Sequence, residues 1–278
     1  MQTLRFVLCD VFTDRPLAGN QLAVFTDARE LDAATMQALA LELGFSETAF
    51  VLPPERGGHV RLRIFSPREE MRFAGHPTLG AAFVLAAPLQ LGVIGLETGA
   101  GLVEVALERD EAGRITFGRM RQPVPRVLPV QHPEAVLAAL GVPGSALPVE
   151  LYDNGATHIF VTLEEEDAVA ALAPASQAIA QLGVTGVNCV AGSGRRWKSR
   201  MFWALGEDAA TGSAAGPLAC HLARHGAIEW GSEIVISQGA ELGRPSTLYA
   251  RAEGAGGEIT AVEVGGQAVV VARGEFRL

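Results

Sequence analysis

The amino-acid sequence predicts an α+β protein of two similar halves, each a strand-rich layer around one apolar helix. Two glycine turns lead into apolar helical runs, one in residues 72–87 and one in residues 207–225. The turns and the residues before them align at one offset of 137, and strand-like runs between them cluster in hairpin-like groups, which favours a mixed or antiparallel sheet. The matched pairs are Arg63 with Arg200, Phe65 with Phe202, Glu70 with Glu207, Gly75 with Gly212, His76 with Ser213 and Ala82 with Ala219.

Composition indicates a globular protein with a large core. The chain has 278 residues, a hydrophobic content of 49%, a mean hydropathy of +0.24 and a formal net charge of −9. This acidic balance argues against general binding of nucleic acid. The most apolar stretch, 79–96, is interrupted by proline and glycine, so no membrane span is expected. Three widely spaced cysteines and an N-terminus without a signal-peptide pattern predict a cytoplasmic protein.

The first domain is expected to cover 1–121. Helical spacing from Met36 to Leu43, followed by Gly44, predicts a helix at 32–43, and alternating apolar residues predict a strand at 59–65. The second apolar helix is expected at 76–87. Further strands are expected at 3–12, 21–26, 93–97, 102–109 and 114–119, and 45–52 is expected to be a loop that enters a strand.

The second domain is expected to cover 127–264, after a proline-rich linker at 122–126. The predicted helices are 133–140, 175–182 and 212–225. The predicted strands are 149–152, 157–163, 187–191, 196–203, 233–237, 246–252, 259–264 and 268–272. The last of these is expected to return to the first domain, so that 267–278 completes it.

The turn at Glu207–Pro217 is the strongest candidate for a binding site. Gly212 would let a ligand approach the backbone, and the first N–H groups of a helix favour an anion. An ordinary helix N-cap at Thr211 or Ser213 is the alternative. If both central helices begin at a common cleft, their N-termini could hold a carboxylate.

Three motifs in order resemble the PhzF family, and the similarity covers essentially the whole chain. They are Ser46-Glu47-Thr48-Ala49-Phe50, Phe73-Ala74-Gly75-His76-Pro77 and Glu207-Asp208-Ala209-Ala210-Thr211-Gly212-Ser213-Ala214. The resemblance implies a diaminopimelate-epimerase-like fold of two pseudo-symmetric domains, each a mixed β barrel around a central helix, and a homodimer. It implies isomerisation of trans-2,3-dihydro-3-hydroxyanthranilate, a small carboxylate, without a metal or organic cofactor.

The resemblance also implies roles for particular residues. Glu47 would be the catalytic carboxylate, with His76 and Asp208 as further acid/base residues. Ser46, Gly75, His76, Gly212 and Ser213 would bind the substrate. Two-thiol racemisation is not expected, because Cys9, Cys189 and Cys220 lie away from Ala74 and Ala209, where this fold's epimerases carry their thiols.

The residues around Glu47 support acid/base chemistry. Its neighbours Phe45, Ala49 and Phe50 are apolar, which we expect to raise the pKa of its carboxyl group. Glu47 could then remove a proton at the hydroxyl-bearing carbon and deliver one to the far end of the conjugated system. Asp208 could hold the substrate amino group, share a proton with His76, or only compensate the helix dipole.

Three functions remain open at this point. The first is the isomerase that the resemblance implies. The second is an isomerase of another small amino or hydroxy acid, which a short segment at 203–206 would favour. The third is a non-catalytic protein that binds a small carboxylate or a partner. A metal site at His221 and His225, four residues apart, is not expected, because no glutamate stands beside them as in a metalloprotease motif.

Overall fold

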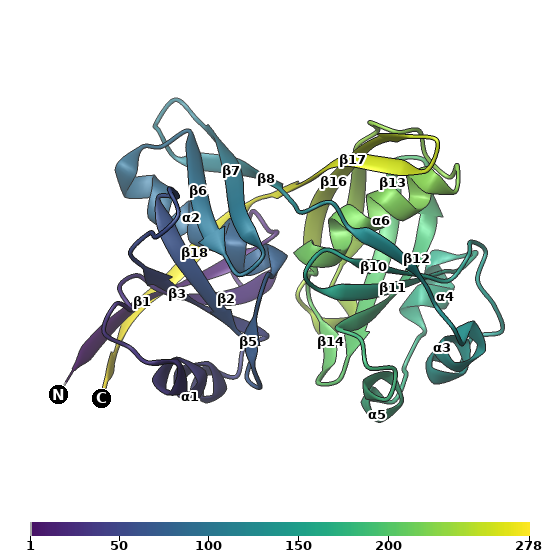
Figure 1. Ribbon diagram of the computed structural model, residues 1–278, viewed down its shortest axis with the longest axis horizontal. Coiled ribbons are helices and arrows are strands. Elements are labelled where there is room, and N and C mark those ends of the chain that lie inside the picture. Colours follow the sequence, from purple (N-terminus) through teal and green to yellow (C-terminus); the bar gives the residue numbers. More distant parts are fainter. Residues whose placement is uncertain (1) are drawn as a thin grey trace. The chain divides into compact units, whose positions relative to one another are not determined.

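The computed structural model describes residues 2–278, which divide into two compact units. The first unit holds the chain up to Arg121 together with Gly265–Leu278, and the second holds Gln122–Val264 (Figure 1). Both units combine a mixed sheet with a few helices, as the sequence predicts for the α+β class. Among residues 2–278, no helix is long and apolar enough to cross a membrane.

The sheet of the first unit is mixed. Strands β2 and β3 pair in parallel, as do β4 and β6, and the other pairs are antiparallel. Its strands are β1 Thr3–Val11, β2 Asn20–Phe25, β3 Glu47–Leu52, β4 Val60–Phe65, β5 Glu70–Met71, β6 Val93–Thr98, β7 Gly101–Arg109, β8 Ile115–Arg121 and β18 Ala268–Arg277. Its helices are α1 Ala33–Leu43 and α2 Gly75–Leu89.

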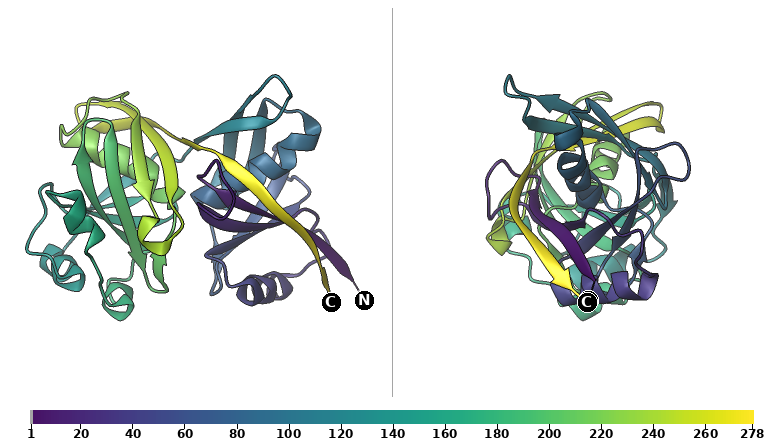
Figure 2. Two further views of the ribbon diagram at one scale, coloured as in Figure 1. Left: turned by 180° about the vertical axis from the view of Figure 1, so that it is seen from behind. Right: turned by 90° about the vertical axis from the view of Figure 1, so that its left-hand side faces the viewer.

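The C-terminal strand belongs to the first unit. β18 pairs antiparallel with β1 from Thr3↔Arg277 to Val11↔Ala268, and the two strands run side by side to the chain ends (Figure 2). The strand is longer than the predicted 268–272, because β1 offers it backbone partners along its whole length. The first and last strands of the chain thus complete one sheet.

The second unit repeats the pairing pattern of the first. β10 and β11 are antiparallel, β11 and β12 parallel, β12 and β13 antiparallel, and β13 and β15 parallel. Its strands are β9 Arg126–Pro129, β10 Glu150–Asp153, β11 Thr157–Thr162, β12 Gly186–Ser193, β13 Arg196–Trp203, β14 Gly206–Asp208, β15 Ile234–Gln238, β16 Ser246–Ala255 and β17 Glu258–Gly266. Its helices are α3 Pro133–Leu140, α4 Glu166–Ala170, α5 Ser176–Ala180, α6 Gly212–Arg224 and the 3₁₀ turn Ala240–Leu242.

Each unit has one helix that is buried on nearly all sides. In α2, residues 75–83 are all buried, and the helix contacts β1, β2, β3, β6, β7, β8 and β18. In α6, every residue from Gly212 to Ala223 is buried, and the helix contacts β11 and β16. A helix that is apolar all round is stable only inside a protein core. The polar residues in the first turns of both helices are therefore buried as well.

Two sequence predictions need correction. Gln122 is not part of a free linker: it is 6% exposed, and its backbone N–H donates to the carbonyl of Val262. The helix predicted at 175–182 covers only Ser176–Ala180. The N–H groups of Leu182 and Gly183 bond three residues back rather than four, so the chain tightens before Gly183 instead of continuing the helix.

The sequence repeat places the same ion pair in both units. Arg63 makes two hydrogen bonds to Glu70, at 2.7 and 2.6 Å, and Arg200 makes two to Glu207, at 2.8 and 2.7 Å. The environments differ: the Arg200 and Glu207 side chains are 8% and 9% exposed, against 17% and 43% for the first pair. Arg200 also donates to three carbonyls near α4, including those of Val169 and Leu172.

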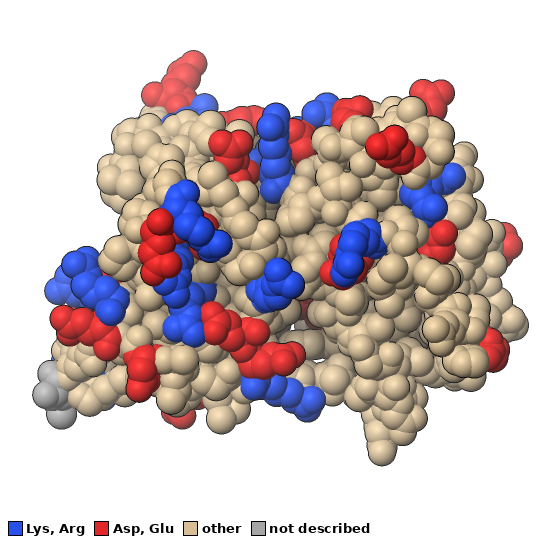
Figure 3. Space-filling view, viewed as in Figure 1, with Lys and Arg blue, Asp and Glu red and all other residues tan. Residues whose placement is uncertain are grey.

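On the face shown in Figure 3, basic and acidic side chains are interspersed, and no large area of this face is purely basic. Ion pairs within one unit include Arg114 with Asp110 and Arg126 with Asp153. This distribution agrees with the acidic composition, which argues against a nucleic-acid surface.

We expect Arg200→Met to destabilise the protein more than Arg63→Met. Removing Arg200 leaves the Glu207 carboxylate buried without its partner, which costs about 3–5 kcal/mol. Removing Arg63 leaves a carboxylate that water reaches, which costs about 1 kcal/mol or less. Urea unfolding of both variants at pH 7 measures the difference, and equal losses would contradict the burial argument.

Candidate active site

One group of predicted site residues lies where β3 and α2 begin in the first unit. Glu47 is the first residue of β3 and is 8% exposed, and His76 is the second residue of α2 and is 3% exposed. The Nδ1 atom of His76 lies 3.5 Å from Oε2 of Glu47. A carboxylate and an imidazole thus share one buried environment, which suits transfer of a proton.

An amide side chain, whose role the sequence does not predict, lies beside this pair. Asn20, the first residue of β2, places its Nδ2 atom 3.2 Å from His76 Nδ1. The hydroxyl of Ser46 donates to Asn20 Oδ1 at 3.1 Å. Among residues 2–278, the Nε2 atom of His76 is buried and has no hydrogen-bond partner.

The start of α2 also offers backbone donors. Gly75 is the first residue of the helix, and the preceding Ala74 has an extended backbone and no side chain that could cap it. The first N–H groups of a helix have no partner inside the helix and form the positive end of its dipole. Gly75 and His76 therefore stand where an anion is stabilised.

His76 is neutral over the physiological pH range. Burial lowers the pKa of its imidazole to about 3, although a backbone hydrogen bond at Gln21 acts in the opposite direction. In the second unit, burial likewise lowers the pKa of His158, which is 0% exposed, to about 3. Neither ring carries the charge that an exposed histidine gains below pH 6.5.

A second group lies before α6 in the second unit. Asp208 ends β14, is 7% exposed, and accepts a hydrogen bond from the Thr211 hydroxyl at 2.7 Å. Gln238, at the end of β15, donates to the Asp208 carbonyl and to the Thr211 hydroxyl, both at 2.9 Å. These bonds fix the turn that carries Asp208 into the helix.

Side chains from other elements hold the first turn of α6. Gln122 donates to the carbonyl of Gly212 at 2.7 Å, and Asn154 donates to the carbonyl of Ser213 at 2.9 Å. The hydroxyl of Ser213 lies 2.9 Å from Nε2 of His158 on β11. Sequence reasoning missed these contacts. The one available signal was a histidine inside the apolar strand 157–163.

The two groups use different chemistry at matching positions. Thr48 pairs with Phe65 as Val187 pairs with Phe202, so the preceding Glu47 corresponds to Gly186. The second unit therefore has no carboxylate where the first has Glu47. It has instead an imidazole, on the neighbouring strand, beside the start of its central helix.

The three cysteines are free thiols in the core. Cys9, Cys189 and Cys220 are each at most 1% exposed, and burial raises the pKa of each thiol well above its usual value. Protonated thiols of this kind are poor bases and poor nucleophiles. Their location agrees with the sequence argument against two-thiol chemistry.

His221 and His225 meet a carboxylate that the sequence does not place near them. Glu150 on β10 accepts from His225 Nε2 at 2.9 Å, and its Oε2 lies 3.4 Å from His221 Nδ1. The ligand atoms of the three residues lie within 4.8 Å of one another, as in a possible metal site. The same oxygen also accepts from Arg224 at 2.7 Å and from Tyr152 at 2.9 Å, and the guanidinium would repel a metal ion placed there.

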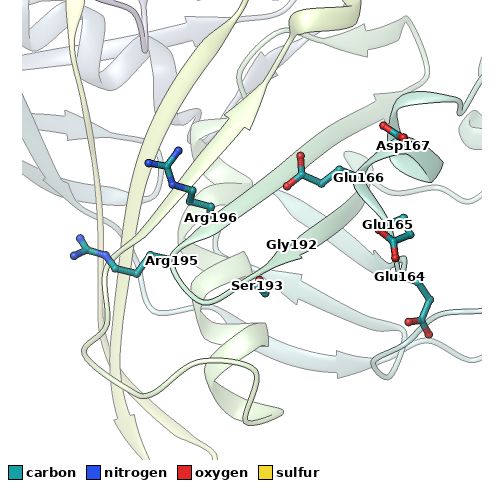
Figure 4. A pocket seen from close by; sticks show the side chains of 8 residues that line it. All are labelled: Glu164, Glu165, Glu166, Asp167, Gly192, Ser193, Arg195 and Arg196. Carbon is teal, nitrogen blue, oxygen red and sulfur yellow. The ribbon is translucent and has the colours of Figure 1, made fainter.

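A cavity of the second unit lies beside α4. It has about 730 Å³ and is open to the surface between α4 and the β12–β13 hairpin (Figure 4). The acidic run 164–167, which leads into α4, lines it together with Arg195 and Arg196. None of the predicted site residues lines it.

The short segment 203–206 forms a tight hairpin. Trp203 pairs with Gly206, so only Ala204 and Leu205 turn the chain. The corresponding segment of the first unit, between Phe65 and Glu70, has the same number of residues. The repeat therefore accounts for the length of this segment.

The chain is similar to several known proteins. The sequence model of the family described as "Phenazine biosynthesis-like protein" matches residues 9–274. A trans-2,3-dihydro-3-hydroxyanthranilate isomerase of Pseudomonas aeruginosa is 49% identical over 277 residues, which cover 99% of each chain. Two solved structures are similar. One is a predicted epimerase of P. aeruginosa (TM-score 0.84, 32% identity, 98% and 99% covered), and the other is a PhzF-family protein of Bacillus anthracis (TM-score 0.86, 24% identity, 100% of both covered).

We expect stability to fall as the pH is lowered from 7 to 5. Between pH 6.5 and 3, the unfolded chain binds protons at His76 and His158 and the folded chain does not. Proton binding stabilises the unfolded state, so the free energy of unfolding falls. Each ring contributes about 2 kcal/mol of this loss at pH 5. Urea unfolding at both pH values should show a smaller loss for His158→Gln, whose amide does not titrate.

The control variant is His132→Gln, which changes an exposed histidine. Its loss of stability between pH 7 and pH 5 should match that of the unmodified protein. An unchanged pH dependence in His158→Gln would contradict the inference that this imidazole is neutral when folded.

Proposed function

Because the chain belongs to the family of phenazine biosynthesis-like proteins, we propose that it isomerises trans-2,3-dihydro-3-hydroxyanthranilate in phenazine biosynthesis. The observation that carries the proposal is the buried pair Glu47 and His76, with 3.5 Å between carboxylate and imidazole. The P. aeruginosa relative that bears this activity in its name supports the choice of substrate.

In the proposed reaction, Glu47 moves a proton between two carbon atoms. Its carboxylate removes the proton from the hydroxyl-bearing carbon, and the electron pair of that C–H bond shifts through the conjugated double bonds. The carboxylic acid then returns a proton to the carbon at the far end. The resulting enol tautomerises to a ketone, so the atoms of substrate and product are the same and no oxidant or reductant is needed.

The other proposed site residues bind and orient the substrate. His76, through its available Nε2, and the backbone N–H groups at Gly75 and Gly212 contact the substrate carboxylate or hydroxyl. Ser46 supports His76 through Asn20, and the Ser213 hydroxyl adds a contact to the carboxylate. Such preorganised donors hold a reactant in place without having to reorganise during the reaction.

Asp208 has a separate role in this proposal. Its carboxylate, held by Thr211, binds the amino group of the substrate and acts on that group as acid or base. One charge-assisted hydrogen bond between a carboxylate and an ammonium is stronger than a neutral one. Asp208 therefore contributes to affinity and orientation, while Glu47 moves the proton.

The wider architecture is part of the same proposal. We assign both units to the diaminopimelate-epimerase-like fold, each with a barrel around its central helix, and we propose that the protein is a homodimer. Sedimentation should then give about twice the chain mass of 29.2 kDa, whereas the mass of one chain would contradict the dimer.

The two carboxylates should respond differently to substitution. We expect Glu47→Gln to lower kcat by about 10²–10⁴-fold while KM stays similar, because only proton transfer is lost. We expect Asp208→Asn to raise KM by about tenfold or more, because a charged hydrogen bond to the substrate is lost. Ultraviolet absorbance follows the disappearance of trans-2,3-dihydro-3-hydroxyanthranilate in both cases.

The matched control is Glu42→Gln, which makes the same change at an exposed residue of α1 and should leave the rate unchanged. A near-normal rate for Glu47→Gln would remove this residue from the mechanism. If the unmodified protein binds 3-hydroxyanthranilate but does not convert the proposed substrate, it acts on another small amino or hydroxy acid. If it neither binds 3-hydroxyanthranilate nor converts the proposed substrate, the proposed function as an isomerase of a small carboxylate is wrong.

A further inference from the structure

We propose that His158 is a positioning residue that sets the direction of the Ser213 hydroxyl group, so that this hydroxyl donates its hydrogen to the substrate carboxylate. The inference rests on the proposed function, in which Ser213 contacts that carboxylate. His158 itself does not touch the substrate in this account. It acts through the 2.9 Å contact between its Nε2 atom and the Ser213 Oγ atom.

The position of the ring is set by the sheet. His158 lies on β11, beside β12, in parallel register with Gly186. It is 0% exposed, and Ser213 is 6% exposed, so water does not compete for their hydrogen bond. A buried imidazole must have its polar atoms satisfied by protein groups, which makes its orientation well defined.

Asn188 determines which ring nitrogen carries the proton. Its Nδ2 atom donates to the carbonyl of Ile159 at 3.2 Å, and turning the amide over would place two oxygens at that distance. The same NH₂ group lies 3.4 Å from Nδ1 of His158. Because a donor faces Nδ1, that nitrogen is the acceptor of the ring and the hydrogen is on Nε2.

The direction of the last bond follows. The Nε2–H group of a neutral His158 donates to Ser213 Oγ, and burial keeps the ring neutral. A hydroxyl that accepts one hydrogen bond still has its own hydrogen to donate. Ser213 makes no other side-chain hydrogen bond within residues 2–278. Its hydrogen is therefore directed away from His158, at the start of α6, where a carboxylate is stabilised.

The alternative arrangement is disfavoured by the same contacts. If Ser213 donated to Nε2, the hydrogen of His158 would be on Nδ1, facing the NH₂ group of Asn188. The Nδ1–H group of His158 and the NH₂ group of Asn188 would then face each other away from water, and neither would have an acceptor there. Ser213 would also present only oxygen lone pairs to a carboxylate, which would repel it.

Two substitutions separate the role of the N–H group from that of the ring. His158→Gln places an amide N–H near the position of Nε2, whereas His158→Leu fills a similar volume without a donor. We expect His158→Leu to raise KM for the proposed substrate, and Kd for 3-hydroxyanthranilate, by about 5-fold to 10-fold. We expect kcat to stay within about twofold, because Ser213 binds substrate and transition state alike. His158→Gln should restore most of the affinity.

The double variant tests whether His158 acts through Ser213. In a Ser213→Ala background, we expect His158→Leu to change KM by less than about twofold, because the hydroxyl that it orients is gone. An equal effect of His158→Leu with and without Ser213 would overturn the proposal, since it would show a general structural role. A His158→Gln variant that binds the substrate as weakly as His158→Leu would also overturn the proposal.

The free protein provides a measurement that does not depend on turnover. The ¹⁵N resonances of the His158 ring should show a neutral imidazole with its hydrogen on Nε2 between pH 5 and pH 8. A hydrogen on Nδ1, or a charged ring, would overturn the proposal even if His158→Leu failed to fold. If the unmodified protein neither converts the substrate nor binds 3-hydroxyanthranilate, the proposed function fails. If it does both and the variants behave otherwise than expected, only the role of His158 fails.

Discussion

The polar side chains at the starts of two buried helices must be hydrogen-bonded, because water does not reach them. His76 and Ser213 occupy the second position of α2 and of α6, where each side chain is at most 6% exposed. An unsatisfied polar group in such a place costs about 1–3 kcal/mol. On neighbouring strands, Asn20 lies beside Nδ1 of His76, and His158, which Asn188 contacts, lies beside the Ser213 hydroxyl, whereas Nε2 of His76 has no partner among residues 2–278. The positions of those strands therefore decide the chemistry of each helix start.

The two units show how one repeated plan can hold two kinds of chemistry. Both retain the bidentate arginine–glutamate pair and the same parallel and antiparallel strand pairings. They differ beside the helix start, where Glu47 in one unit corresponds to Gly186 in the other. One unit thus has a buried carboxylate beside an imidazole, and the other has a serine hydroxyl beside a buried imidazole.

Much of the fold could be predicted from the sequence, because its signals are local. Helical spacing and Gly44 marked α1, and alternation marked β4. The repeat offset aligned Arg200 with Arg63 and Glu207 with Glu70, and the structure shows the same ion pair in both units. The α+β class and the mixed sheet follow from these patterns.

The partners of the site residues could not be predicted in the same way. Asn20, His158 and Gln238 lie far from their partners in the sequence, and only the strand register brings them together. The same holds for Glu150, which reaches His221 through the pairing of β10 with β11. A single sequence contains no signal for register between distant strands, whereas motif spacing within one turn is visible directly.

In the proposed reaction, a protein carboxylate removes a proton from the hydroxyl-bearing carbon of the substrate. The most direct measurement uses trans-2,3-dihydro-3-hydroxyanthranilate with deuterium at that carbon and follows both the rate and the position of the label by NMR. We expect a slower reaction than with the unlabelled compound and loss of the deuterium from that carbon in the product. An unchanged rate, with the deuterium still on that carbon, would contradict it.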